Sequence, residues 1–551
     1  MNSLINHKKS LAIGILALVI SLIIRRYCKR ILARKLKKQS LLENIKNKTK
    51  MRDLTFNFQK IHGLKVSPEI KRKVLESGIL ELQKMLTSKI VTSEQITLIF
   101  YERIVKIGKS LNLVTEIMFE RALRHAQQCD KLREENPEKC KGYLFGIPFS
   151  LQDHFLVKGY DSTCGNPNRC FQPAQEDCFL IKLLEEQGAF PLVKSNIPSD
   201  STVKECHNIF WGRAKNPIND AFSLQVAEAG LIAAGCSSFG IAIDYFGSLR
   251  ISALSCGVVG FKPTTGRIID SGYVKEYYKP FTKEYLHKSP GILARDASDL
   301  NLIMKSLINN SLYDQEKVLL ECPTYMRKEW NEAKILQQKL TIGYIKEFKS
   351  HPISHWNLKA IERAIELLRK ENYQVIEIDT SKITEILNIA EEIISRREIE
   401  CQHSSEYNTN MSIHCKKSLS NSKACFSSAD ELKNKILKAE GSFFEIWKEK
   451  NLDAIILPGS VVPGFKHGYT ETGNDFYTVV FEIFNCSFGV VPVSKVQEAD
   501  ENSKNLNLPQ SLRENMDGMT GLPLGVQVVT PPWEDEKCVN VMMRIQKLAL
   551  S

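Results

Sequence analysis

The sequence has 551 residues, of which 43% are hydrophobic and 25% are charged. This is the composition of an ordinary globular protein with one large domain or two modest ones, and we find no internal repeat of about 20 to 50 residues. The formal net charge of +12 does not indicate a nucleic-acid-binding protein, because the basic residues concentrate near the N-terminus.

That basic cluster follows an apolar run at residues 11–24, LAIGILALVISLII. As a helix the run would reach about 21 Å, short of the roughly 30 Å hydrocarbon core, so spanning it would require flanking Lys and Arg side chains to snorkel. No small-residue cleavage site follows, which favours an uncleaved signal-anchor over a shallow interfacial helix or a buried core helix. The basic residues after the run fit anionic lipid headgroups and place the main body in the cytoplasm. They are Arg25, Arg26, Lys29, Arg30, Arg34, Lys35, Lys37 and Lys38.

Fifteen cysteines are scattered along the chain, and without a small secreted context they predict reduced thiols. The best candidate metal ligands are Cys401, His403, His414 and Cys415. Their spacing is not that of a zinc finger and the surrounding segment is rich in Ser and Asn, so we favour a solvated loop. We expect neither a metal nor a cofactor.

Hydrophobic periodicity predicts three N-terminal packing helices. One covers residues 69–88, a second begins at Thr92 with a capping box completed by Gln95, and a third covers residues 116–132. Alternating strands and helices follow, which predicts an α/β protein with a largely parallel or mixed sheet. Strands are expected at residues 145–150, 189–194, 240–245, 340–345, 374–378 and 454–457, with a helix at 358–370.

The most informative segment is residues 227–267, AEAGLIAAGCSSFGIAIDYFGSLRISALSCGVVGFKPTTGR. Its pattern predicts a helix, a buried strand, a tight turn presenting a serine, and a second helix. We call residues 244–250 the serine turn. Asp244 and Arg250 flank Ser248 and are expected to pair and brace the turn.

The serine turn resembles the Asp-x-Gly-Gly-Ser-x-Arg turn of the amidase signature family. Asp244, Gly247, Ser248 and Arg250 match it, and further matches follow in the family's order from about Ser93 to the C-terminus. They lie at residues 146–148, 161–163, 196–198, 216–217, 260–264, 294–296, 489–493 and 521–523. The chain is most similar to the fatty-acid amide hydrolase branch of the family.

The resemblance implies a single domain in which a mixed β-sheet is layered between α-helices. We therefore divide the chain into residues 1–38, a membrane anchor with a basic juxtamembrane segment; 39–92, a helical packing segment; and 93–551, the amidase-signature domain. The fatty-acid amide hydrolases also begin with one apolar segment, and they dock on the bilayer through an apolar helical hairpin. Here, between residues 391 and 439, the stretch 404–431 is polar and loop-like with only weak helical periodicity on either side, so membrane contact would rest on the N-terminus alone.

The resemblance also implies a serine nucleophile, a bridging serine and a lysine base. Ser248 stands at the nucleophile position, but Gln152 stands at the lysine position and Leu224 at that of the bridging serine. An amide cannot accept a proton near neutral pH and a leucine cannot relay one. The oxyanion donors and the substrate-facing surface would be Tyr245, Phe246, Gly247 and Ser248, where Phe246 replaces a glycine and is strained if φ is positive.

Two rescues remain open, and a third pattern is set aside. The loop between residues 216 and 228 is shorter than the family's, so Ser223 could lie near the missing bridging serine. His154 could replace the base, since it would share a face with Gln152 on an extended strand. Ser201 and Lys204 have a serine-lysine spacing that we treat as chance.

The sequence thus predicts a membrane-associated amidase-family protein, on endomembranes with a cytoplasmic body, whose hydrolytic machinery is lost or reduced. It would be a pseudoenzyme that binds an acyl amide or a protein partner. The alternative is an active serine hydrolase that acts on fatty acid amides or esters through Ser248 and a replaced base. A homodimer is possible on the family resemblance.

Overall fold

The structure is a computed structural model. It describes residues 2–55, 60–61, 63–198, 204–269, 271–274, 285–314, 328–337, 339–403, 427–469, 475–498 and 508–551. Within these ranges the side chains of most residues up to 24, of Cys28, Arg30, Ile31 and Arg34, and of residues 398–403 are not described.

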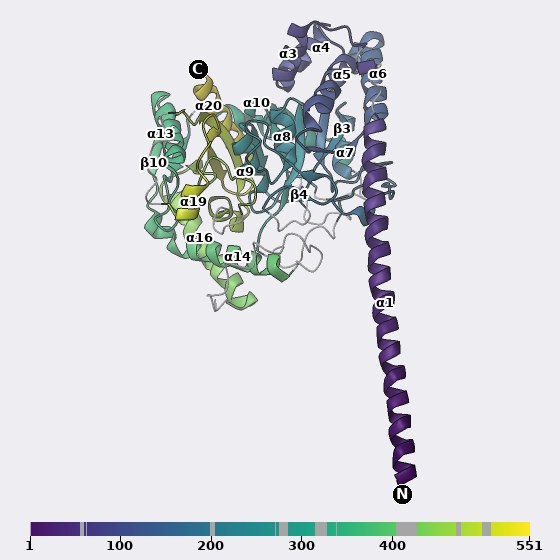
Figure 1. The fold of residues 1–551 in the computed structure, drawn as a ribbon. Helices are drawn as coiled ribbons and strands as arrows, with labels where there is room; N and C mark the ends of the chain where they lie inside the picture. The colour runs from purple at the N-terminus through teal and green to yellow at the C-terminus, as the bar shows by residue number, and fades with distance from the viewer. Residues whose placement is uncertain are drawn as a thin grey trace.

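The centre of the described fold is one 11-stranded sheet in the order β1-β3-β2-β6-β8-β7-β12-β13-β11-β9-β10 (Figure 1). Its strands are β1 (Val114–Ile117), β2 (Pro148–Gln152), β3 (Phe190–Ser195), β6 (Phe239–Asp244), β7 (Val259–Lys262), β8 (Ser289–Ala294), β9 (Thr341–Tyr344), β10 (Gln374–Glu377), β11 (Ala454–Leu457), β12 (Ser487–Lys495) and β13 (Pro523–Thr530). A separate small ladder joins β4 (His207–Asn208) and β5 (Gly212–Arg213).

The sheet is mixed, as predicted. Strands β2, β3 and β6 run parallel, β6-β8-β7-β12-β13 is antiparallel, and β9, β10 and β11 are parallel again. Because β2 and β6 are parallel neighbours, their carboxyl ends lie at the same edge of the sheet. Gln152 ends β2 and Asp244 ends β6, so the fold brings the serine turn beside the position of the family lysine.

Helices pack on both the sheet and each other. They are α3 (Pro68–Glu76), α4 (Ile79–Thr87), α5 (Ser93–Arg103), α6 (Phe119–Glu135), α7 (Phe179–Glu186), α8 (Ala227–Ala233), α9 (Ser248–Cys256), α10 (Ala297–Ile308), α12 (Glu332–Leu336), α13 (His355–Lys370), α14 (Thr384–His403), α16 (Ala429–Glu449), α17 (Phe476–Val479), α19 (Gln510–Glu514) and α20 (Asp535–Leu550). Helix α9 lies on β7 and α20 on β12. The serine turn is therefore seated in the main hydrophobic core.

Helix α1 (Asn2–Leu54) lies along one side of the body and its N-terminal part projects well beyond it (Figure 1). Near its C-terminal end, Lys48 is only 8% exposed and its ammonium lies 2.7 Å from both Glu116 and Asp161. Arg52 donates to the carbonyl of Val114 and its guanidinium stacks 5.2 Å from the ring of Trp211. These contacts fix the last turns of α1 to the body.

None of the helices whose side chains are described is long and apolar enough to cross a membrane. The apolar run at residues 11–24 lies outside that part of the chain, because only the helical path of its backbone is described. The predicted anchor stays a prediction.

Three predicted elements need correction. Residues 69–88 form two helices, α3 and α4, separated at Ser77 and Gly78, because the Asp299 carboxylate accepts from the backbone N–H groups of Ile79 and Leu80 and so caps a new helix start. The helix expected from residue 116 begins at Phe119, since residues 114–117 pair with β3 as strand β1. The segment 391–439 is more helical than expected at both ends, where α14 and α16 enter it, while residues 404–426 are outside the described ranges.

Other predictions are confirmed. The six expected strands are present with their ends shifted by a few residues, and Thr92 and Gln95 form the predicted capping box at the start of α5. Five strands of the large sheet, β1, β7, β8, β12 and β13, were not predicted.

Candidate active site

The serine turn connects strand β6 to helix α9, whose first residue is Ser248. Phe246 and Gly247 have φ angles of 60° and 81°. Glycine adopts this left-handed conformation freely, whereas for a phenylalanine it costs on the order of 1 kcal/mol or more. The backbone at Phe246 is therefore held in the conformation that the family's glycine would adopt, and Ser248 is half-buried at the start of the helix.

A buried ion network braces the turn. The guanidinium of Arg250 donates at 2.8 Å to Asp244 and at 2.6 Å to Glu482, and it also donates to the Gln527 side chain. Burial disfavours the guanidinium cation, but the charges of Asp244 and Glu482 more than offset this and raise the pKa of Arg250. The predicted pairing of Asp244 with Arg250 is confirmed.

Helix α17 also contacts the turn, and the Arg250 guanidinium donates to the Thr478 carbonyl at 2.8 Å. The Thr478 hydroxyl donates to the carbonyl of Phe246 at 3.0 Å. A Cβ on Gly247 would lie 2.1 Å from the Cβ of Thr478, so only glycine fits there. The turn is thus held both by the ion network and by α17.

Two of the four expected oxyanion donors are already used inside the turn. The Gly247 N–H donates to the Asp244 carboxylate at 2.9 Å and the Ser248 N–H donates to the Tyr245 carbonyl at 3.3 Å. An oxyanion would therefore depend on the N–H groups of Tyr245 and Phe246, whose buried rings crowd the same backbone.

Gln152 lies where the resemblance places the lysine base, at the end of β2 beside β6. It is 4% exposed, and its side-chain oxygen accepts from the Ile243 N–H at 3.1 Å. The amide is thus held against the strand that leads into the serine turn. The amide can form hydrogen bonds, but it cannot accept a proton from Ser248 near neutral pH.

Leu224 is buried in the main hydrophobic core, next to Gly230 of α8. The next two backbone N–H groups, of Gln225 and Val226, donate to the hydroxyl of Ser252 at 3.1 and 3.0 Å. Ser252 in turn donates to the carbonyl of Ser248 at 2.7 Å. The loop that carries Leu224 is therefore attached to helix α9, which begins with the candidate nucleophile, and it has a leucine where the resemblance places the bridging serine.

Ser252 could not be predicted from the sequence, because a serine within a helix of mixed small residues carries no distinguishing signal. Its hydroxyl proton is used by the Ser248 carbonyl and its lone pairs by two N–H groups, so it joins the loop to the helix and cannot relay a proton. The backbone N–H of Ser223 donates to the Phe465 carbonyl and the residue bridges to Lys215. These backbone contacts do not test its hydroxyl, so the role suggested for Ser223 stays a prediction.

His154 is not on an extended strand with Gln152, and that interpretation is wrong. Strand β2 ends at Gln152, whose carbonyl accepts from the Phe155 N–H in a turn. The His154 ring is fully buried between the rings of Phe155 and Tyr273, at centroid distances of 4.4 and 5.8 Å. Burial, together with the nearby charges of Lys288 and Lys194, lowers its pKa well below the usual range, so it is a poor base.

Lys204 is part of a second buried ion group near the turn. Its ammonium lies 3.4 Å from the Asp475 carboxylate, which also accepts from Arg397 at 2.6 Å. Ser201 lies outside the described residues, so the serine-lysine spacing is not tested. The sequence did not indicate Asp475 or Arg397, which are distant in the chain and meet only through the fold.

Among the described residues no group of His, Cys, Asp and Glu could hold a metal ion. The side chains of Cys401, His403, His414 and Cys415 lie outside this part of the chain, so the expectation about them is untested.

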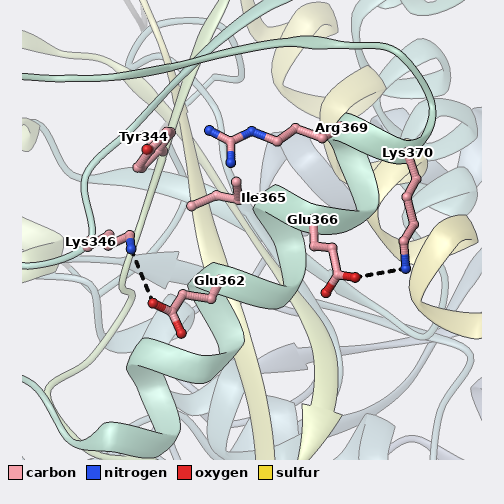
Figure 2. A pocket seen from close by; sticks show the side chains of 7 residues that line it. All are labelled: Tyr344, Lys346, Glu362, Ile365, Glu366, Arg369 and Lys370. Carbon is pink, nitrogen blue, oxygen red and sulfur yellow. Dashed lines mark hydrogen bonds and ion pairs between the residues drawn. The ribbon is translucent and has the colours of Figure 1, made fainter.

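A surface hollow of about 390 Å³ lies on the far edge of the sheet, between β9 and the C-terminal half of α13 (Figure 2). Its charges are mostly paired, Lys346 with Glu362 at 3.1 Å and Lys370 with Glu366 at 2.8 Å, while Arg369 faces the Tyr344 ring. None of its seven lining residues belongs to the serine turn, so this hollow is separate from the candidate active site.

Comparison with known proteins agrees with this fold. Residues 95–539 match the family described as Amidase, and the chain belongs to that family. It is 25% identical over 464 residues to fatty-acid amide hydrolase 1 of Sus scrofa, covering 74% of this chain and 76% of that protein.

Two further similarities show how far the properties of known proteins can be carried over to this chain. The chain is 30% identical over 331 residues to Amidase 1 of Gibberella moniliformis, covering 59% of this chain and 62% of that relative, which is less than two thirds of the relative's length. A solved structure titled fatty acid amide hydrolase superposes with a TM-score of 0.73 at 22% identity, covering 92% of this chain and 90% of that one. At this identity the structural likeness shows the fold alone.

Proposed function

We propose that this amidase-family protein is a catalytically impaired relative of the fatty-acid amide hydrolases that binds an acyl amide or ester at the serine turn. The observation that carries the proposal is Gln152, held on Ile243 at the position of the family's lysine base. Amide hydrolysis needs a base that removes the nucleophile's proton and returns it to a poor amine leaving group. Neither Gln152 nor Leu224 can do so.

A second candidate function is hydrolysis of reactive esters by Ser248 with a replaced base. One observation favours it: the serine turn keeps its Asp244–Arg250 brace and presents a half-buried serine at a helix start. Against it stands His154, because a histidine with a strongly lowered pKa is a weak proton acceptor.

Fluorophosphonate labelling distinguishes the two functions, with Ser248→Ala as the control. An impaired protein should give no labelling above that of Ser248→Ala at reagent concentrations that label an active serine hydrolase. Rapid labelling that the Ser248→Ala substitution abolishes would favour the ester hydrolase.

We also propose that residues 1–38 attach the protein to a membrane with the body on the cytoplasmic side. Support comes from the apolar run at residues 11–24 and from the exposed basic side chains that follow it on α1, such as Arg25, Arg26 and Lys29. Separation of membrane and soluble fractions for the full chain and for a chain that begins at residue 39 tests this proposal.

A further inference from the structure

Arg397 occupies an unusual position on helix α14. The helix buries Ile389, Ala390, Ile393 and Ile394, and Arg397 continues this face at helical spacing, where an apolar residue is expected. Its side chain is only 3% exposed. Burying a guanidinium costs several kcal/mol unless it is paired, so its contacts decide what it does.

Those contacts connect α14 to the serine turn. The guanidinium donates to Asp475 at 2.6 Å, and its central carbon lies 4.0 Å from the centroid of the Phe246 ring. The Phe246 ring also contacts the ring of Tyr245, edge-on, with 4.8 Å between the ring centroids. We call Arg397, Asp475 and Phe246 the arginine clamp.

Asp475 also holds the start of helix α17 next to the serine turn. Its carbonyl accepts from the backbone N–H groups of Thr478 and Val479 and from the Thr478 hydroxyl. Thr478 contacts the turn at Phe246 and Gly247. The arginine clamp thus joins three elements, α14, α17 and the turn, around the Phe246 side chain, which is fully buried.

We propose that the arginine clamp sets the acyl specificity of this site: the Arg397 guanidinium and the Phe246 ring fill the α14 side of the serine turn, so Ser248 accepts short acyl groups such as acetyl and excludes long alkyl chains. This inference rests on the proposed function in taking the serine turn as the substrate-facing surface. An alkyl chain on that side would have to displace a buried ring and break a buried ion pair, and it would regain only about 0.8 kcal/mol per buried methylene.

The experiment uses the full chain with Ser248→Cys, so that accessibility is measured without any catalytic base. Methyl and hexyl methanethiosulfonate react with the introduced thiol, and mass spectrometry of the peptide that contains residue 248 gives each rate. Each rate is divided by that of the same reagent with free glutathione. Arg397→Leu combined with Asp475→Asn removes the ion pair and leaves the Lys204 ammonium facing a neutral amide, and Phe246→Gly removes the ring.

The matched control is Arg396→Leu, one residue away on the same helix. Arg396 pairs with Glu392 at 2.5 Å and also donates to the Ser427 carbonyl, so it links α14 to the start of α16.

We expect hexyl modification of Ser248→Cys to be at least about 10-fold slower than methyl modification, the discrimination that a filled apolar subsite gives. Opening the arginine clamp by either route should raise the hexyl rate at least about 10-fold with little change in the methyl rate, and Arg396→Leu should change neither. Equal methyl and hexyl rates, or an unchanged ratio after both openings, would overturn the inference. So would a thiol that reacts with neither reagent, because the site would then exclude short groups as well.

These outcomes are independent of hydrolysis. A fluorophosphonate-reactive Ser248 would refute the impaired function and leave the thiol rates as they are, whereas equal thiol rates would refute the specificity and leave the impairment standing.

Discussion

Gln152 and Leu224 are the two residues on which the proposed impairment depends, and both are buried in places that suit their present side chains. Gln152 uses its side-chain oxygen on Ile243, and Leu224 belongs to the main hydrophobic core. Each side chain is thus part of the surrounding packing, so replacing one of them changes local contacts as well as the chemistry of the site.

Restoring the family residues should therefore work only in combination. We expect the triple variant Gln152→Lys, Leu224→Ser and Phe246→Gly to gain hydrolysis of an acyl amide, while each single variant stays at the background rate. Members of a catalytic group act as a unit, and losing the base alone forfeits roughly three or more orders of magnitude. Initial rates with matched protein concentrations test this, and the same triple variant with Ser248→Ala is the control.

Single variants that each recover a part of the rate would contradict this expectation. A folded triple variant that remains inert would instead show that the alignment of residues 221–227 with the family's glycine- and serine-rich loop is wrong.

Glu228 gives a residue-scale prediction about pH. It is fully buried, with one oxygen accepting from the Ser150 hydroxyl, and burial raises its pKa from 4.5 to about 8. The folded state therefore holds a proton that the unfolded state has released, so the stability contributed by this proton is complete below about pH 4.5 and is lost as the pH rises through about 8.

We expect Tm to fall between pH 5 and pH 8 in the parent and to fall less in Glu228→Gln. Differential scanning fluorimetry across this range measures it, with exposed Glu138→Gln as the control. Parallel Tm curves for the parent and Glu228→Gln would contradict the assignment.

At the scale of elements, what the sequence predicted well depends on local signals. Apolar strand patterns at β2, β3, β6, β9, β10 and β11 and the capping box at Thr92 are local, and all are present. The missed strands β12 and β13 pair with each other and with distant β7 and β11. Their identity as strands depends on partners that no short window of sequence contains.

The same distinction applies to the site. The serine turn could be predicted because Asp244, Ser248 and Arg250 are close in sequence. The arginine clamp could not, since Phe246, Arg397 and Asp475 come from three separate segments. The interpretation of His154 was wrong because β2 ends at Gln152 and a turn follows, so His154 is not on the strand face that it was expected to share with Gln152.

The junction of α1 with the body gives an element-scale prediction. Lys48→Met would leave Glu116 and Asp161 buried without the ammonium that now lies between them. Breaking a buried ion group in this way costs about 3 to 5 kcal/mol. Urea unfolding should show this loss for Lys48→Met, whereas Lys46→Met on the exposed side of the same helix should change stability by no more than about 0.5 kcal/mol. Equal effects of the two substitutions would contradict the docking role of Lys48.

At the scale of the whole molecule, α1 combines a docked end and a projecting end (Figure 1). Removing residues 1–38 keeps Lys48 and Arg52, the contacts that hold the helix to the body. We expect this truncated chain to fold and to leave the membrane fraction, because the apolar run and the whole basic cluster are lost.

Retention of the truncated chain with membranes would show that another surface docks on lipid. If high salt alone strips the full chain from membranes, the interfacial interpretation of residues 11–24 is favoured over a spanning helix.

The central claim is that this amidase-family protein lacks the machinery to acylate Ser248. Its most direct test is a pre-steady-state measurement with p-nitrophenyl acetate. The acetyl group of this ester is short enough for a site that is bounded by the arginine clamp as proposed above. The account predicts no burst of p-nitrophenolate and the same slow release from the parent and from Ser248→Ala. A stoichiometric burst that Ser248→Ala abolishes, accompanied by an acetyl adduct on the peptide containing Ser248, would contradict it.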